Sequence, residues 1–150
     1  MKVLIFSLLA LCFFCHKDRI EVIDAYSQEW IAGQQDGNNG TNYFFAIKVS
    51  KSSENLAFKE LWIGNERIPF RLFTDIHTTG DTTFAKNDTV YIRGQIIEDN
   101  YLDVKDTSEI SVEEPPIDYT GEALIVYTYR QKLKYYVVKE VEKKSTLRRP

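Results

Sequence analysis

The sequence is poor in the residues that carry most protein chemistry, with two cysteines, two histidines and one methionine in 150 residues. Both cysteines, Cys12 and Cys15, lie near the N-terminus, so the chain after residue 15 can form no disulfide and holds no thiolate. The histidines, His16 and His77, are too few and too far apart in sequence to predict a zinc site. We therefore expect neither a metal site nor a cofactor.

Motifs of catalysis and of nucleic-acid binding are also missing. No Gly-x-Ser-x-Gly motif occurs, and beyond His77 there is no histidine around which a Ser-His-acid set could be built in the domain. The glycine-rich loop 33–40 does not lead from a strand into a helix, so it does not predict a phosphate cradle. The net charge of −3 supplies no basic field for nucleic acid. The sequence thus predicts a protein that is not an enzyme.

The N-terminus holds the longest apolar run. Met1 and Lys2 precede twelve uncharged residues, Val3–Phe14, and polarity begins abruptly after Cys15. A helix of that length spans about 18 Å, well short of a hydrocarbon core of about 30 Å. Residues 1–14 are therefore predicted to be a signal peptide, with a buried core segment or a short uncleaved anchor as alternatives.

The border of this segment, Cys15-His16-Lys17-Asp18, resembles the signal of small lipoproteins of Bacteroidota. The resemblance implies that the Cys15 thiol carries diacylglycerol and that Cys15 becomes the new N-terminus, with Cys12 as the rival site. Phe14 departs from the family pattern, which has a small residue before the cysteine. Because His16 rather than Asp follows, the resemblance implies an outer-membrane lipoprotein, facing either the periplasm or the cell surface. The acyl chains would hold the domain on the membrane.

The rest of the chain has the pattern of short strands separated by turns. Alternating or β-branched and aromatic runs occur at Ile20–Tyr26, Tyr43–Val49, Leu56–Ile63, Arg67–Phe73, Asp88–Ile97, Glu122–Tyr129 and Leu133–Val141. They predict an all-β domain, an antiparallel, immunoglobulin-like β-sandwich, with a small OB-like barrel as the alternative because strand number and spacing fit both. We expect a signal peptide at 1–14, a tether at 15–19, the sandwich at 20–142 and a frayed basic tail at 143–150.

Charge is unevenly distributed over the second half of the chain. Residues 98–118 contain eight acids and one base, whereas residues 130–149 contain eight bases and two acids. The acidic stretch lacks the regular spacing and the glycine of a calcium loop, so a solvated loop is the simpler interpretation.

Aromatic side chains are the remaining candidates for binding. Trp30, just before the glycine-rich loop, and Tyr127 and Tyr129 in the last hairpin are the binding residues that the sequence suggests, although rings in such strands also fill cores. The first hypothesis is a non-catalytic, lipid-anchored envelope protein that binds a protein or another envelope component. The alternative is a carbohydrate or small-ligand module that uses exposed aromatics.

Two short patterns resemble the O-glycosylation sites of exported Bacteroidota proteins. Asp81-Thr82-Thr83 and Asp88-Thr89-Val90 both match, and the resemblance implies a glycan on Thr82 or Thr89. Patterns of three residues also arise by chance.

The lipoprotein hypothesis predicts that globomycin blocks processing of the chain in expressing cells, because globomycin inhibits the peptidase that cleaves lipoprotein signals. Mass spectrometry of the mature protein should find the acyl groups on Cys15. Processing that is insensitive to globomycin, with no acyl group on Cys15, would contradict the hypothesis.

Overall fold

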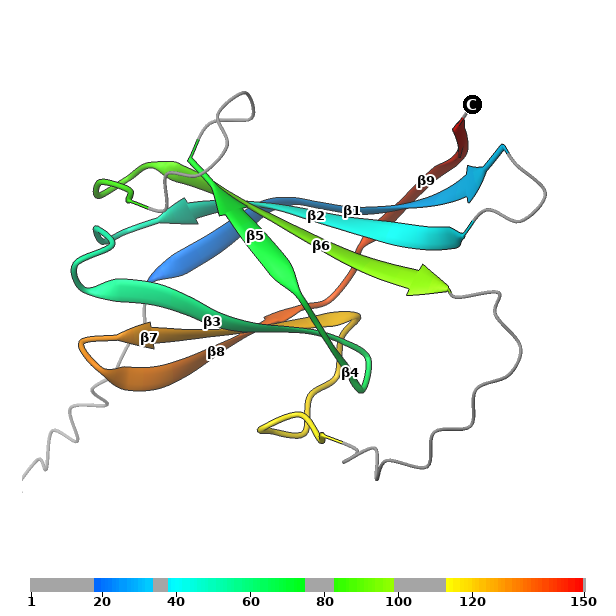
Figure 1. Cartoon of the computed structure of the whole chain (residues 1–150). Coiled ribbons are helices and arrows are strands. Elements are labelled where there is room, and N and C mark those ends of the chain that lie inside the picture. Colours follow the sequence, from blue (N-terminus) through cyan, green and yellow to red (C-terminus); the bar gives the residue numbers. More distant parts are fainter. Residues whose placement is uncertain (1–17, 34–37, 75–82, 99–112, 150) are drawn as a thin grey trace, which may run out of the picture.

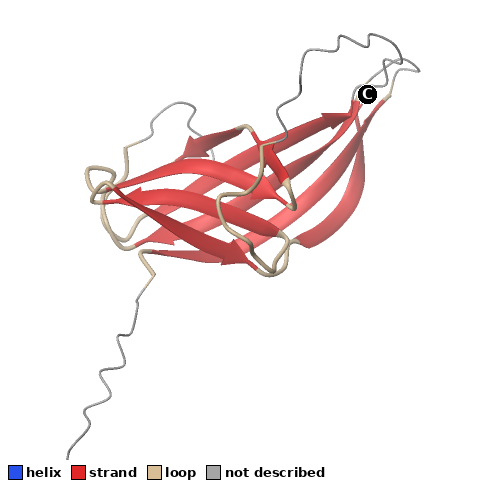
Figure 2. Cartoon of the chain, turned by 90° about the horizontal axis from the view of Figure 1, so that it is seen from below, coloured by secondary structure: helices blue, strands red, loops and turns tan. Residues whose placement is uncertain are grey.

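The computed structural model describes residues 18–33, 38–74, 83–98 and 113–149, and every regular element among them is a β-strand (Figure 2). The strands are β1 (Ile20–Ala32), β2 (Asn39–Val49), β3 (Leu56–Ile63), β4 (Glu66–Ile68), β5 (Phe70–Phe73), β6 (Thr89–Glu98), β7 (Ala123–Tyr129), β8 (Lys132–Val138) and β9 (Glu142–Arg149). Sheet A has the strand order β5-β6-β2-β1-β9 and sheet B the order β4-β3-β7-β8 (Figure 1). The predicted all-β sandwich is confirmed, and the OB-like barrel does not form.

The strand order is that of an immunoglobulin-like sandwich. In that fold the first, second, fifth and fourth strands make one sheet and the third, sixth and seventh make the other. Here β1, β2, β6 and β5 correspond to the first set, and β3, β7 and β8 to the second, with the short β4 added at the edge of sheet B. The pairs along each sheet are antiparallel except for β1 and β9, which are parallel.

The core lies between the two sheets and follows from the period-two alternation of their strands. On β2 the inward side chains Phe45, Ile47 and Val49 are fully buried, and those between them point outward. The other large side chains that are fully buried between the sheets are Leu56, Leu61, Ile92, Ile125 and Val90. Because the described core contains no cysteine, its cohesion comes from apolar burial, which contributes about 25 cal/mol per Å².

The predicted strand Arg67–Phe73 is divided at Pro69, where the chain passes from sheet B to sheet A. β4 pairs with β3 before the proline, and β5 pairs with β6 after it. Proline cannot donate to a ladder, so it suits a crossing between edge strands. Gly94 of β6 makes room for the crossing, because a Cβ there would lie 2.6 Å from Cδ1 of Ile68.

The C-terminus corrects the prediction of a frayed basic tail at 143–150. β9 runs parallel to β1, from the pair Tyr26–Glu142 to the pair Ala32–Arg149. The Gln28 side chain donates to the carbonyl of Ser145 at 2.9 Å, and the Thr146 hydroxyl lies 3.4 Å from a Glu29 carboxylate oxygen. Without β9, the backbone N–H and C=O groups along the outer edge of β1 would have no partner in the sheet, and β9 supplies those hydrogen bonds. The domain therefore continues to Arg149.

The outward face of sheet B carries a second, smaller apolar cluster. Trp62, Leu124 and Val126 are buried there, and Ile117 and Tyr119 from the segment before β7 pack against them. This segment, residues 113–121, crosses the outside of the sheet (Figure 1, yellow), and we call it the covering segment. The structure thus buries Trp62 on the outside of sheet B rather than between the two sheets.

Leu124→Ala should therefore destabilise the protein by about 2–5 kcal/mol although the residue faces away from the main core, because it leaves a cavity under the covering segment. Urea unfolding followed by fluorescence measures the change. Lys59→Ala, at an exposed position on β3 of the same sheet, is the control and should change stability by no more than about 0.5 kcal/mol. Equal effects of the two substitutions would mean that the cluster is not packed as described.

Candidate functional site on the outer face of sheet A

Two of the three aromatic residues suggested by the sequence are buried, which corrects the expectation that they form an exposed platform. Tyr127 is 2% exposed because it points inward from β7, with its ring 6.5 Å from that of Phe58. Trp30 is 7% exposed and points outward from β1, with its ring over Gly40 of β2. A Cβ at residue 40 would lie 2.9 Å from Cζ2 of Trp30, so the glycine is what allows the ring to lie down on the sheet.

The third residue, Tyr129, is half-buried at the end of β7. The guanidinium groups of Arg19 and Arg130 lie 4.9 and 5.4 Å from its ring centroid. These cation–π contacts join the chain before β1 to the β7–β8 turn. Tyr129 therefore has a structural role at that end of the sandwich, and the structure does not bring it together with Trp30.

The predicted modification sites are mostly outside the described residues. Cys15 and Thr82 lie there, so the structure says nothing of them. Thr89 is the first residue of β6, half-exposed and paired with Lys48 of β2.

The outward face of sheet A carries a row of four half-buried rings that the sequence analysis did not single out, which we call the aromatic row. It runs across four adjacent strands and consists of Phe73 on β5, Tyr91 on β6, Phe44 on β2 and Tyr26 on β1. The Tyr26 and Phe44 rings are stacked with centroids 5.1 Å apart, and the Phe44 and Tyr91 centroids are 5.8 Å apart. Alternation with the buried core residues of each strand places these rings on the outside.

Neighbouring rings within the row contact one another. Tyr26 has Phe44 on one face, and Nζ of Lys144 from β9 lies 3.4 Å from its ring centroid. A cation–π contact with Lys144 therefore ends the row at the β9 edge of the sheet.

A row of amide side chains runs beside the aromatic row. Gln28, Asn42 and Gln95 are direct neighbours across β1, β2 and β6, and the first two lie two residues along their strands from Tyr26 and Phe44. The side-chain oxygen of Asn42 is buried and accepts no hydrogen bond from a described residue. A ligand on this face would therefore meet both donors and acceptors.

At the β5 edge, the outer face is hollowed into a cleft of about 450 Å³. Its lining comprises Pro69, Phe70, Arg71, Phe73, Arg93 and Gln95. Arg71 and Arg93 are exposed and directly opposite each other in the β5–β6 pair. Aromatic, amide and cationic groups therefore meet in one cleft.

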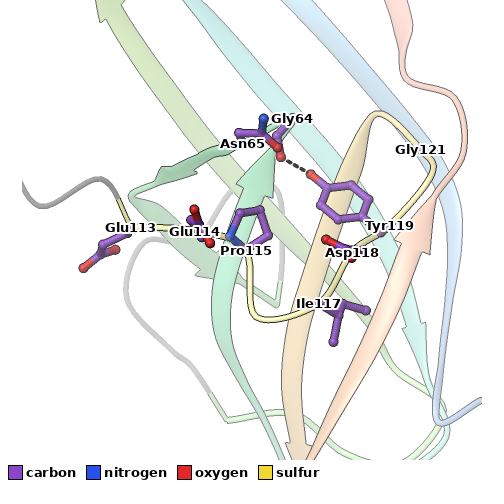
Figure 3. Close-up of a pocket in the computed structure, with 9 residues that line it drawn as sticks. All are labelled: Gly64, Asn65, Glu113, Glu114, Pro115, Ile117, Asp118, Tyr119 and Gly121. Carbon is purple, nitrogen blue, oxygen red and sulfur yellow. Dashed lines mark hydrogen bonds between the residues drawn. The ribbon is translucent and has the colours of Figure 1, made fainter.

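A second hollow, of about 520 Å³, lies between the β3–β4 turn and the covering segment (Figure 3). Its Tyr119 hydroxyl donates to the Gly64 carbonyl, and its Glu113 carboxylate is bound 3.0 Å from the Arg67 guanidinium. Figure 3 shows that the carboxylates of Glu113, Glu114 and Asp118 do not converge on one point. Among the residues that the structure describes, no group of three or more His, Cys, Asp or Glu could hold a metal ion.

Alternation was the signal by which the aromatic row could have been found. Tyr26, Phe44 and Tyr91 lie one position away from inward core residues, so their strands place them outside. The pairing partners Arg71 and Arg93 could not be found, because the β5–β6 register is not readable from sequence.

The buried tyrosines predict a loss of stability in alkali. Burial raises the pKa of Tyr127 above its ordinary value of 10.0, and burial also raises the pKa of Tyr43 and Tyr119. Since these folded-state pKa values exceed the unfolded ones, their stabilisation is present below about pH 10 and is lost as the pH rises above it. The urea concentration at the unfolding midpoint should decrease as the pH rises above about 10, and it should decrease less steeply in Tyr127→Phe. Equal slopes would show that Tyr127 is not buried as a neutral phenol.

Comparison with family models, curated proteins and solved structures gives no match to this chain. In the described part of the chain, no helix is long and apolar enough to cross a membrane. What the outer face of sheet A can bind follows from its own side chains.

Proposed function

We propose that this chain is a non-catalytic, lipid-anchored protein of the bacterial cell envelope, and that its sandwich binds a protein partner through the outer face of sheet A. The observation that carries the proposal is the aromatic row, which the core does not need. On sheet B the corresponding apolar face is covered by residues 113–121, whereas the rings of sheet A remain half-exposed. Uncovered aromatic surface on a folded domain is typical of interaction sites.

The composition of the face supports a protein partner. Protein interfaces are enriched in tyrosine, phenylalanine and arginine, and paratopes add amide groups for adaptable hydrogen bonding. The aromatic row, the amide row and the arginines of the β5 edge supply these groups side by side.

The stacking within the row supports protein over carbohydrate. A sugar ring packs its C–H groups on an open aromatic face. The Phe44 ring stacks on Tyr26, Nζ of Lys144 lies 3.4 Å from the Tyr26 ring centroid, and Phe44 is also in contact with Tyr91. Rings that already pack against one another and against a cation suit the varied side chains of a protein better than they suit a glycan.

The expected anchor would leave this face accessible. Ile20 is the fifth residue after Cys15, so an acylated Cys15 would hold the start of β1 within about 18 Å of the bilayer. β1 then continues for 13 residues, about 43 Å, and the outer face lies along it. A partner in the periplasm or at the cell surface could reach the face from the side.

Tyr91→Ala should reduce recovery of the partner from crosslinked envelopes at least about tenfold, since truncation of an interface hot spot costs about 2 kcal/mol or more. Tyr129→Ala, which removes a half-buried tyrosine from sheet B, is the matched control and should leave recovery unchanged. Far-ultraviolet circular dichroism of both variants checks that they fold. Equal recovery with Tyr91→Ala and wild type, or no stoichiometric partner with wild type, would overturn the proposal.

A further inference from the structure

Arg71 and Arg93 form a pair of like charges on the outer face. They are direct neighbours across the β5–β6 ladder, and both side chains are exposed. Both residues flank inward positions, so they share the outward face with Phe73 and Tyr91. Two arginines opposite each other repel and destabilise the strand pair.

No described carboxylate offsets this repulsion. The ion pairs made within the described residues belong to Arg67, which contacts Glu60 at 3.8 Å and Glu113 at 3.0 Å on the other sheet. Neither Arg71 nor Arg93 makes such a contact. An anion bound between the two guanidinium groups would turn the repulsion into attraction.

The surroundings of the pair form a receptive cleft. Its volume of about 450 Å³ suits one or two side chains of a partner, and its wall includes the Gln95 amide and the Phe73 ring. Guanidinium groups bind carboxylates through two parallel hydrogen bonds, which gives direction as well as charge. Gln95 also belongs to the amide row, so the cleft continues into the proposed binding face.

We propose that Arg71 and Arg93 bind the carboxylates of an acidic segment of the protein partner. This inference rests on the proposed function and names the chemistry of the partner. β5 is the terminal strand of sheet A, so its outer edge can also pair with the main chain of an extended segment. The acidic side chains of such a segment would meet the arginines while its backbone extends the sheet.

The position of the pair favours a peptide over an anionic lipid headgroup. Arg93 is level with Phe44 and Tyr26, and Tyr26 lies six residues beyond the start of β1. At about 3.3 Å per residue the pair is about 20 Å from the end of the sandwich nearest Cys15. A bilayer at the tethered end would therefore not contact the pair.

The test is binding of fluorescein-labelled hexaglutamate to the full protein purified from membranes in neutral detergent, followed by fluorescence anisotropy at low salt. Arg93→Gln and Arg71→Gln should each weaken binding at least about tenfold, and hexaglutamine should not bind. The matched control Arg148→Gln removes an exposed arginine from β9 at the opposite edge of the same sheet, and should change affinity less than about twofold.

Three results would overturn the inference. Hexaglutamate could bind equally to Arg93→Gln and wild type, or Arg148→Gln could weaken binding as much as Arg93→Gln, which would indicate general charge attraction. Alternatively, phosphatidylglycerol vesicles could require Arg93 while hexaglutamate does not bind, which would assign the pair to lipid. The melting temperature of Arg93→Gln without ligand should equal or exceed that of wild type, because the substitution relieves repulsion, so unfolding would not explain lost binding.

The inference and the proposed function can fail separately. If the double variant with both Arg71→Gln and Arg93→Gln still recovers the envelope partner at wild-type levels while Tyr91→Ala does not, the face binds a protein but not through the partner's carboxylates. If Tyr91→Ala also recovers the partner at wild-type levels, the proposed function itself is wrong.

Discussion

The packing of two apolar sheet faces against each other is the interaction on which the rest of the molecule depends. The described domain contains no cysteine and no metal cluster, so burial of side chains such as Phe45, Leu61 and Ile125 must hold the sheets together. Strand alternation then determines what faces outward. The two outer faces differ: residues 113–121 cover an apolar cluster on sheet B, whereas the aromatic row stays half-exposed on sheet A. That difference is the physical basis of the proposed binding face.

The two edge strands of sheet A, β9 and β5, both carry positive charge on the outer face. At one edge β9 closes the open side of β1, and its Lys144 lies against the ring of Tyr26. Lysines on an exposed edge strand oppose uncontrolled pairing with other chains. At the other edge β5 is four residues long and brings Arg71 opposite Arg93. One edge is thus protected by charge, while the other concentrates charge next to a cleft.

Local patterns in the sequence predicted most strands and the fold class. β3 has the predicted bounds, and β7 and β8 follow the predicted hairpin, because β-branched and aromatic runs with a short turn are local signals. The division at Pro69 and the pairing of β9 with β1 depend on contacts between distant residues, which a local pattern does not contain. The candidate site could not be predicted for the same reason. The burial of Trp30 depends on Gly40 of the neighbouring strand, and the charge pair of Arg71 and Arg93 depends on the β5–β6 register.

Photocrosslinking in living cells tests most directly whether the outer face of sheet A is the binding face. Benzoylphenylalanine placed at Gln95, where the amide row meets the cleft, should yield a discrete crosslinked species, and the same group placed at Lys59, exposed on sheet B, should not. Crosslinks from residue 59 but not from residue 95 would contradict the account.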